Sequence, residues 1–186
     1  MIPQRCRDLA NYELASRATG GTIVYVFAAT ILYLWSPFFR ERTAQFAFVF
    51  LVLAYFSYSR YRAALFVKSR SGVGCEAAVR SLEKNTLASA FIFGSLAAWG
   101  VYTHTDLTRW MLVTVVGALA GGAISSLIPS SNHLYIRYSL LLTGPSIIAL
   151  LLLPDQTAQA SGVMAAAFTT LMAFFGSQQS HIFHHR

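Results

Sequence analysis

The stretch SRYRAALFVKSRSGVGCEAAVRSLEK, residues 59–84, decides how this chain is organised. It carries six of the fourteen lysine and arginine residues and lies between two apolar runs. A short basic segment between hydrophobic stretches is typical of a cytoplasmic loop, because positive charge is retained on the cytoplasmic side of a membrane. We therefore expect residues 59–84 to form a cytoplasmic linker between membrane-spanning helices.

The composition supports a membrane protein of the all-α class. Hydrophobic residues make up 55% of the chain and charged residues only 11%, whereas charged residues are about a quarter of a soluble domain. The net charge of +7 lies between the apolar runs, where it meets lipid headgroups rather than nucleic acid. We therefore expect the lipid bilayer as a partner and no nucleic acid.

Six apolar segments are close to the roughly 20 residues that a spanning helix needs. They predict an integral membrane bundle of six transmembrane helices. The expected spans are 20–38, 44–60, 85–103, 109–128, 136–153 and 160–178.

The distribution of positive charge predicts the orientation of these spans. With the N-terminus inside, eleven lysine and arginine residues lie on the cytoplasmic side and three lie outside, which favours both termini in the cytoplasm. Trp35, Trp99 and Trp110 then all lie at the outer interface, where aromatic residues anchor helices. Residues 1–19 are expected to be a cytoplasmic N-terminal segment.

The second half of the linker predicts a short cytoplasmic amphipathic helix between the second and third spans. Gly72 and Gly74 interrupt the chain, and Asn85 is a suitable N-cap for the third span. The intervening apolar residues follow a helical period, namely Cys75, Ala78, Val79 and Leu82. A solvated loop with a helical turn or two is the alternative.

Small residues at intervals along the spans predict close helix packing or hinges. Such residues let helix backbones approach one another. They serve packing within one bundle, and they also suit a dimer interface or a sliding surface. The residues concerned are Gly94 in the third span, Gly117, Gly121 and Gly122 in the fourth, and Gly144 with Pro145 in the fifth.

Two regions are candidates for ligand binding. Pro145 interrupts the helical hydrogen bonding of the fifth span, and Thr143 beside it can satisfy part of the freed backbone, so a cavity or a hinge is expected there, with a packed kink as the alternative. The second region is the outer turn, where aromatic and polar residues form either a small-molecule site or interface anchors. Its candidates are Trp99, Tyr102, His104 and Trp110.

Several classes of function lack their residues in this chain. The C-terminal HIFHHR has the spacing of one histidine box, but the chain has five histidines in total, too few for a diiron site. No acidic or basic residue falls deep in an expected span, which disfavours a pump or an ion-coupled transporter. We find no catalytic set that could meet at one depth, so we expect no enzyme, no metal and no cofactor.

The layout resembles a known group of membrane sensors. The fifth span carries a central proline, YIRYSLLLTGPSIIALLLL, and the sixth continues into the polar FFGSQQSHIFHHR. This is similar to the MASE-like N-terminal sensor modules of bacterial sensor histidine kinases and diguanylate cyclases. The resemblance implies a sensor domain over residues 20–178, a signalling helix starting at 179–186, a homodimer in the bacterial inner membrane, and a cytoplasmic effector beyond Arg186.

We therefore expect a non-enzymatic input domain of a signal-transduction protein. It would sense a lipophilic small molecule or the state of the membrane and relay that signal through the sixth helix. A small channel or carrier for an uncharged substrate is the alternative, because such a substrate needs no buried carboxylate. An integral membrane enzyme is the third possibility.

Overall fold

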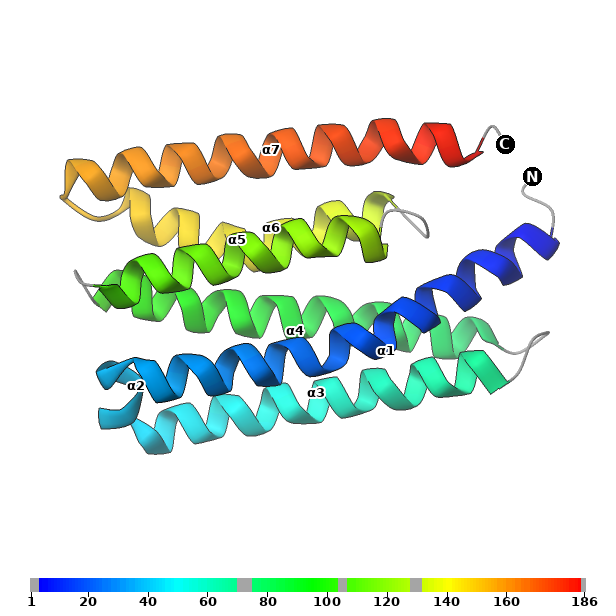
Figure 1. The fold of residues 1–186 in the computed structure, drawn as a ribbon, viewed down its shortest axis with the longest axis horizontal. Coiled ribbons are helices and arrows are strands. Elements are labelled where there is room, and N and C mark those ends of the chain that lie inside the picture. The colour runs from blue at the N-terminus through cyan, green and yellow to red at the C-terminus, as the bar shows by residue number, and fades with distance from the viewer. Residues whose placement is uncertain (1–3, 70–74, 104–106, 128–131, 185–186) are drawn as a thin grey trace.

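The computed structural model describes residues 4–69, 75–103, 107–127 and 132–184. All regular secondary structure in this part of the chain is helical (Figure 1). Its seven helices are α1 (Gln4–Trp35), α2 (Pro37–Glu41), α3 (Thr43–Ser69), α4 (Cys75–Thr103), α5 (Leu107–Leu127), α6 (Asn132–Leu151) and α7 (Gln156–His184).

The six long helices lie side by side and alternate in direction (Figure 1). Extensive contacts join α1 to α3, α3 to α4, α4 to α6 and α6 to α7, while α5 packs across α4 and α6. The first helix begins, and the last ends, at the end of the bundle where α3 is joined to α4. The start of α1, the end of α3, the start of α4 and the end of α7 therefore lie at the same end of the molecule.

Four of the described helices are long and apolar enough to cross a membrane. Their apolar stretches are Leu14–Trp35, Glu76–Thr103, His133–Leu151 and Gln156–Phe175. A shorter apolar stretch, Thr108–Ala123, lies in α5. The second half of α3 is interrupted by tyrosine, serine and arginine residues. These lengths and compositions indicate a helical membrane protein.

The linker differs from the prediction in one respect. Residues 75–84 are helical, but they are the first turns of α4 and do not form a separate amphipathic helix. Asn85 lies within α4, where its side-chain amide donates to Ser59 Oγ at 2.9 Å, so it does not cap the helix. Leu82 is buried and Arg80 is exposed. The helix continues because no glycine or proline separates this amphipathic segment from the apolar one.

Helix α3 also extends further than the expected span of 44–60, because it ends at Ser69. Residues 61–69 are mostly good helix formers, and Ala63, Ala64 and Val67 within them are buried. Arg60 consequently lies inside the helix, and its side chain is only 6% exposed. Arg60, which the sequence assigns to the cytoplasmic linker, is thus a buried residue of the helical bundle.

Candidate functional site

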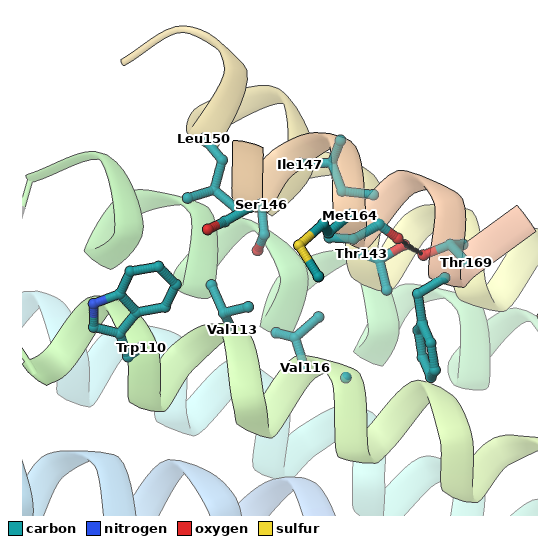
Figure 2. Close-up of a pocket in the computed structure, with 13 residues that line it drawn as sticks. Trp110, Val113, Val116, Thr143, Ser146, Ile147, Leu150, Met164 and Thr169 are labelled. Carbon is teal, nitrogen blue, oxygen red and sulfur yellow. Dashed lines mark hydrogen bonds between the residues drawn. The ribbon is translucent and has the colours of Figure 1, made fainter. Parts of the chain in front are cut away.

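A cavity of about 420 Å³ lies between α5, α6 and α7 (Figure 2). Its wall is mostly aliphatic and aromatic, and its polar groups are four hydroxyls and one indole. Ligand pockets commonly combine an apolar wall with a few polar groups of this kind. The lining residues are Trp110, Val113, Val116, Gly117, Thr143, Ser146, Ile147, Leu150, Ser161, Met164, Ala165, Phe168 and Thr169.

The hydroxyls of this cavity differ in whether they have a hydrogen-bond partner. Thr143 Oγ1 donates to the carbonyl of Ser139, four residues earlier in the helix, at 2.8 Å. Thr169 of α7 lies 3.3 Å from that Thr143 oxygen (Figure 2). Ser146 Oγ is buried and has no partner among the described residues. Ser146 is therefore the lining residue whose hydroxyl has an unmet hydrogen-bonding need, since buried polar groups are normally paired.

The cavity exists because α7 packs chiefly against α6 and touches α5 only slightly. The wall from α5 includes Gly117, and a Cβ added there would meet no described atom within 4 Å. The facing wall from α7 includes Ala165, another small residue. Small residues at both positions leave space that larger side chains would fill.

The predicted ligand-binding residues fall into separate places. Trp110 and Thr143 both line the cavity. Pro145 is not part of the lining, although its neighbour Ser146 is. Tyr102 is exposed near the end of α4, and His104 lies outside the described residues. The structure thus brings together two of the predicted residues.

Trp99 belongs to a different environment, an aromatic cluster at the α2 end of the bundle. Its ring centroid lies 5.0 Å from that of Phe38 and 6.3 Å from that of Phe39. Both phenylalanines are buried and follow Pro37 in α2. Trp99 therefore packs α4 against the short helix and does not face the cavity.

Sequence reasoning missed the contributions of α7 and of Ser146. The α7 wall consists of Ser161, Met164, Ala165, Phe168 and Thr169. These positions follow an i, i+3, i+4 period that marks one face of a helix. The signal was present in the sequence, but nothing local says which neighbour that face meets.

The predicted packing glycines also differ from one another. Gly94 lies close to α6, because a Cβ placed on it would be 2.6 Å from two backbone oxygens. Added Cβ atoms at the other four positions would meet no described atom within 4 Å. Of these five glycines, Gly94 is therefore the one at which the described structure shows that a larger residue would collide with a neighbouring helix.

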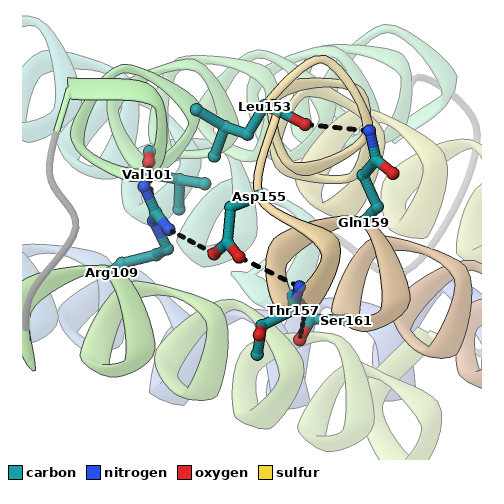
Figure 3. A network of polar contacts seen from close by, with 7 residues as sticks. All are labelled: Val101, Arg109, Leu153, Asp155, Thr157, Gln159 and Ser161. Carbon is teal, nitrogen blue, oxygen red and sulfur yellow. Dashed lines mark hydrogen bonds and ion pairs between the residues drawn. The ribbon is translucent and has the colours of Figure 1, made fainter.

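A buried arginine ties the turn before α7 to the rest of the bundle (Figure 3). Arg109 is 4% exposed, and its Nε donates to the carbonyl of Val101 in α4 at 3.1 Å. Its Nη1 lies 3.6 Å from Asp155 Oδ2, and Oδ1 of the same carboxylate accepts the backbone N–H of Thr157 at 3.1 Å. These contacts hold the first turn of α7 against the ends of α4 and α5.

The side chains of His181, His184 and His185 lie outside the described part of the chain. Among the described side chains, no three histidine, cysteine or acidic residues are grouped so that they could hold a metal ion.

The arrangement offers a mostly apolar wall between three helices and an unpartnered hydroxyl at Ser146, features that suit an apolar molecule with one polar group. Comparison of the chain with protein-family models, with curated proteins and with solved structures finds no match.

Proposed function

We propose that this chain is the membrane-embedded sensing module of a bacterial signalling protein, and that it binds a lipophilic molecule between α5, α6 and α7. The observation that carries the proposal is the apolar cavity of about 420 Å³, one wall of which is the last helix. A molecule in this cavity touches the helix that leaves the bundle at the end carrying the basic linker.

Helix α7 is suited to respond because a smaller share of it is buried than of the three other helices long and apolar enough to cross a membrane. In the apolar stretch of α7, 11% of the residues are buried inside the bundle, whereas 50% are buried in the corresponding stretches of α4 and α6. A ligand shifts a helix only if it binds more tightly to one of two positions. A cavity between α5 and α7 provides this difference, because the distance between the two helices sets its width.

The proposed topology has six spans with both termini in the cytoplasm. In its favour, α3 and α5 run alongside the four helices that are long and apolar enough to cross a membrane (Figure 1). The end of the bundle shared by both terminal helices is also the end that carries most of the lysine and arginine residues. The sensor resemblance adds a dimeric cytoplasmic effector, a kinase or a cyclase, and a location in the bacterial inner membrane.

Binding can be tested through Trp110, which lines the cavity. In a variant with Trp35→Phe and Trp99→Phe, Trp110 is the only tryptophan, and 1-bromooctane quenches tryptophan fluorescence on contact. We expect a saturable component of quenching. Adding Gly117→Leu should remove that component, because the new side chain enters open space in the cavity.

Gly121→Leu is the matched control for this experiment. Gly121 also has open space at its Cβ, but it does not line the cavity. Saturable quenching should therefore persist in Gly121→Leu. Equal quenching in all three proteins would show that 1-bromooctane meets Trp110 only from the surrounding lipid, which contradicts the proposal.

The relay can be tested by the distance between spin labels on α4 and α7. With Cys6 and Cys75 replaced by serine, Phe91→Cys and Thr170→Cys place labels at exposed positions on these helices. Saturating 1-octanol should shift the distance by about 1–2 Å, the scale of helix movements in switching proteins. An unchanged distance, together with flux of an uncharged solute through liposomes that contain the protein, would favour a channel or carrier.

A further inference from the structure

A second site is indicated by Arg60, a cation buried in the bundle far from the apolar cavity. Its Nη2 donates to the carbonyl of Ala18 in α1 at 3.2 Å. The guanidinium carbon lies 6.0 Å from the ring centroid of Tyr25. An added Cβ at Gly21 would overlap Nη2, so this glycine lets the guanidinium lie directly on α1.

Arg60 lacks a counter-charge within the described part of the chain. No described acidic side chain forms an ion pair with it, and its Nε is buried without a hydrogen-bond partner. Burying a charge is costly unless it is paired. The missing partner is an anion.

The space for that anion is present beside the guanidinium. A cavity of about 200 Å³ is bounded by Arg60 together with residues of α1, α4, α5 and α6. Tyr25, Tyr138 and Thr86 contribute hydroxyls to its wall. Tyr25 donates to Tyr138 at 2.5 Å, which leaves the Tyr138 hydroxyl hydrogen free to point toward a bound oxygen.

The side of this cavity between α1 and α5 is lined by residues at the surface of the bundle. These two helices touch only slightly, and the residues on that side, Val24 and Gly122, are exposed. A Cβ on Gly122 would meet no described atom within 4 Å. The passage is therefore lined by apolar and small groups, which suit hydrocarbon chains.

The neighbours of Arg60 along α3 suit a position near a membrane interface. At 1.5 Å per residue, Arg60 lies about 14 Å from Ser69, the end of the helix. The exposed tyrosines Tyr58 and Tyr61 flank it on the same helix. Such tyrosines collect at the membrane interface.

We propose that this cavity binds a phosphate oxyanion through Arg60. A guanidinium offers several N–H donors in a fork that fits phosphate oxygens. Two sources carry that chemistry: the headgroup of an anionic phospholipid, with its chains leaving between α1 and α5, and free inorganic phosphate. The site is separate from the cavity between α5 and α7, so the two proposals stand or fall independently.

The test is retention of phosphatidylglycerol by the full chain in neutral detergent, measured by native mass spectrometry. Dioleoylglycerol, which has the same chains and no phosphate, serves as the ligand control. We expect phosphatidylglycerol to be retained and dioleoylglycerol not. Arg60→Gln should weaken retention by about ten- to a hundredfold, the usual effect of losing a charge-assisted hydrogen bond. Arg62→Gln, an exposed neighbour on the same helix, should leave it unchanged.

Gly122→Leu keeps the proposal testable if Arg60→Gln does not fold, because it narrows the passage and leaves the guanidinium in place. Gly121→Leu is its control, since Gly121 does not line this cavity. Headgroup binding predicts loss of phosphatidylglycerol in Gly122→Leu alone. Displacement of phosphatidylglycerol by inorganic phosphate from the wild-type chain identifies the free anion. Equal retention of phosphatidylglycerol and dioleoylglycerol, or retention that is unchanged in both Arg60→Gln and Gly122→Leu, overturns the proposal.

Discussion

Gly94 of α4 lies directly against the backbone carbonyl of Leu141 in α6. A Cβ on Gly94 would be 2.6 Å from that oxygen and 2.6 Å from the oxygen of Leu142. In a helix the carbonyl of Leu141 would accept the N–H of residue 145, but Pro145 has no N–H. The glycine thus packs against the carbonyl that the proline leaves without its helical donor. Such a close contact brings the Cα–H of the glycine near the carbonyl oxygen, an arrangement that forms weak hydrogen bonds between helices.

Gly94→Ala should destabilise the protein by about 1–3 kcal/mol, the usual cost of adding a methyl group to a packed interior. The new Cβ has no room between two backbone oxygens, so α4 and α6 must separate. Thermal unfolding in detergent measures the effect. Gly121→Ala is the control, because its Cβ enters open space; equal stability of the two variants would contradict the packing.

Ser146→Ala should weaken binding of 1-octanol and leave binding of octane unchanged. The hydroxyl of Ser146 is buried in the apolar cavity and has no partner in the described protein. A hydrogen bond to an alcohol is worth about 0.5–1.5 kcal/mol, which corresponds to roughly a two- to tenfold change in affinity. Competition with 1-bromooctane for Trp110 quenching measures both affinities. An identical loss for octane would mean that Ser146 acts by shape alone.

Arg109→Gln should cost more stability than Asp155→Asn. Arg109 is 4% exposed, whereas Asp155 is 52% exposed. Removing the carboxylate loses a half-exposed ion pair worth about 0–1 kcal/mol, and asparagine can still accept the N–H of Thr157. Glutamine at position 109 also loses the bond from Nε to the carbonyl of Val101, a charge-assisted bond worth about 1.5–3 kcal/mol.

Thermal unfolding of the two single variants checks this order. Arg40→Gln is a suitable control, since Arg40 is exposed at the same end of the bundle and its removal should change stability little. A larger loss in Asp155→Asn than in Arg109→Gln would show that the carboxylate supplies most of the stabilisation of this turn.

The hydrogen bond from Tyr25 to Tyr138 should show measurable coupling between α1 and α6. Both side chains are buried, and the hydroxyl oxygens are 2.5 Å apart. A double-mutant cycle with Tyr25→Phe and Tyr138→Phe should give a coupling free energy of about 0.5–1.5 kcal/mol. The exposed contact between Tyr33 and Thr43 provides a comparison, with coupling near zero expected. If the coupling free energy of the buried pair is no larger than that of the exposed pair, the hydrogen bond from Tyr25 to Tyr138 is contradicted.

The sequence predicted an all-helical membrane protein because apolar runs and charge placement depend on local composition. The linker is a place where local composition did not predict the helix boundaries. Gly72 and Gly74 lie outside the described residues, and the amphipathic segment after them continues into the apolar part of α4 without interruption. Periodicity identifies a helical face, yet it does not say where one helix ends when the following segment is also helical.

The candidate sites were predictable only in part, for the same physical reason. Thr143 was predicted as a candidate because it is near Pro145, and Trp110 because it belongs to the aromatic outer turn. Both line the cavity. Ser146 and the α7 wall were not predicted, because the sequence does not show which neighbour a hydroxyl or a small residue faces. Arg60 was assigned to the linker because charge alone places arginine outside a membrane.

The sequence by itself determined the helical class, the apolar stretches and the concentration of basic residues in the linker, since each follows from local hydrophobicity and charge. Only the tertiary structure decided which faces meet. It placed Gly94 on the carbonyl freed by Pro145, opened the cavity between α5 and α7, and buried Arg60 against α1. These are contacts between residues distant in the chain, and local composition does not specify them.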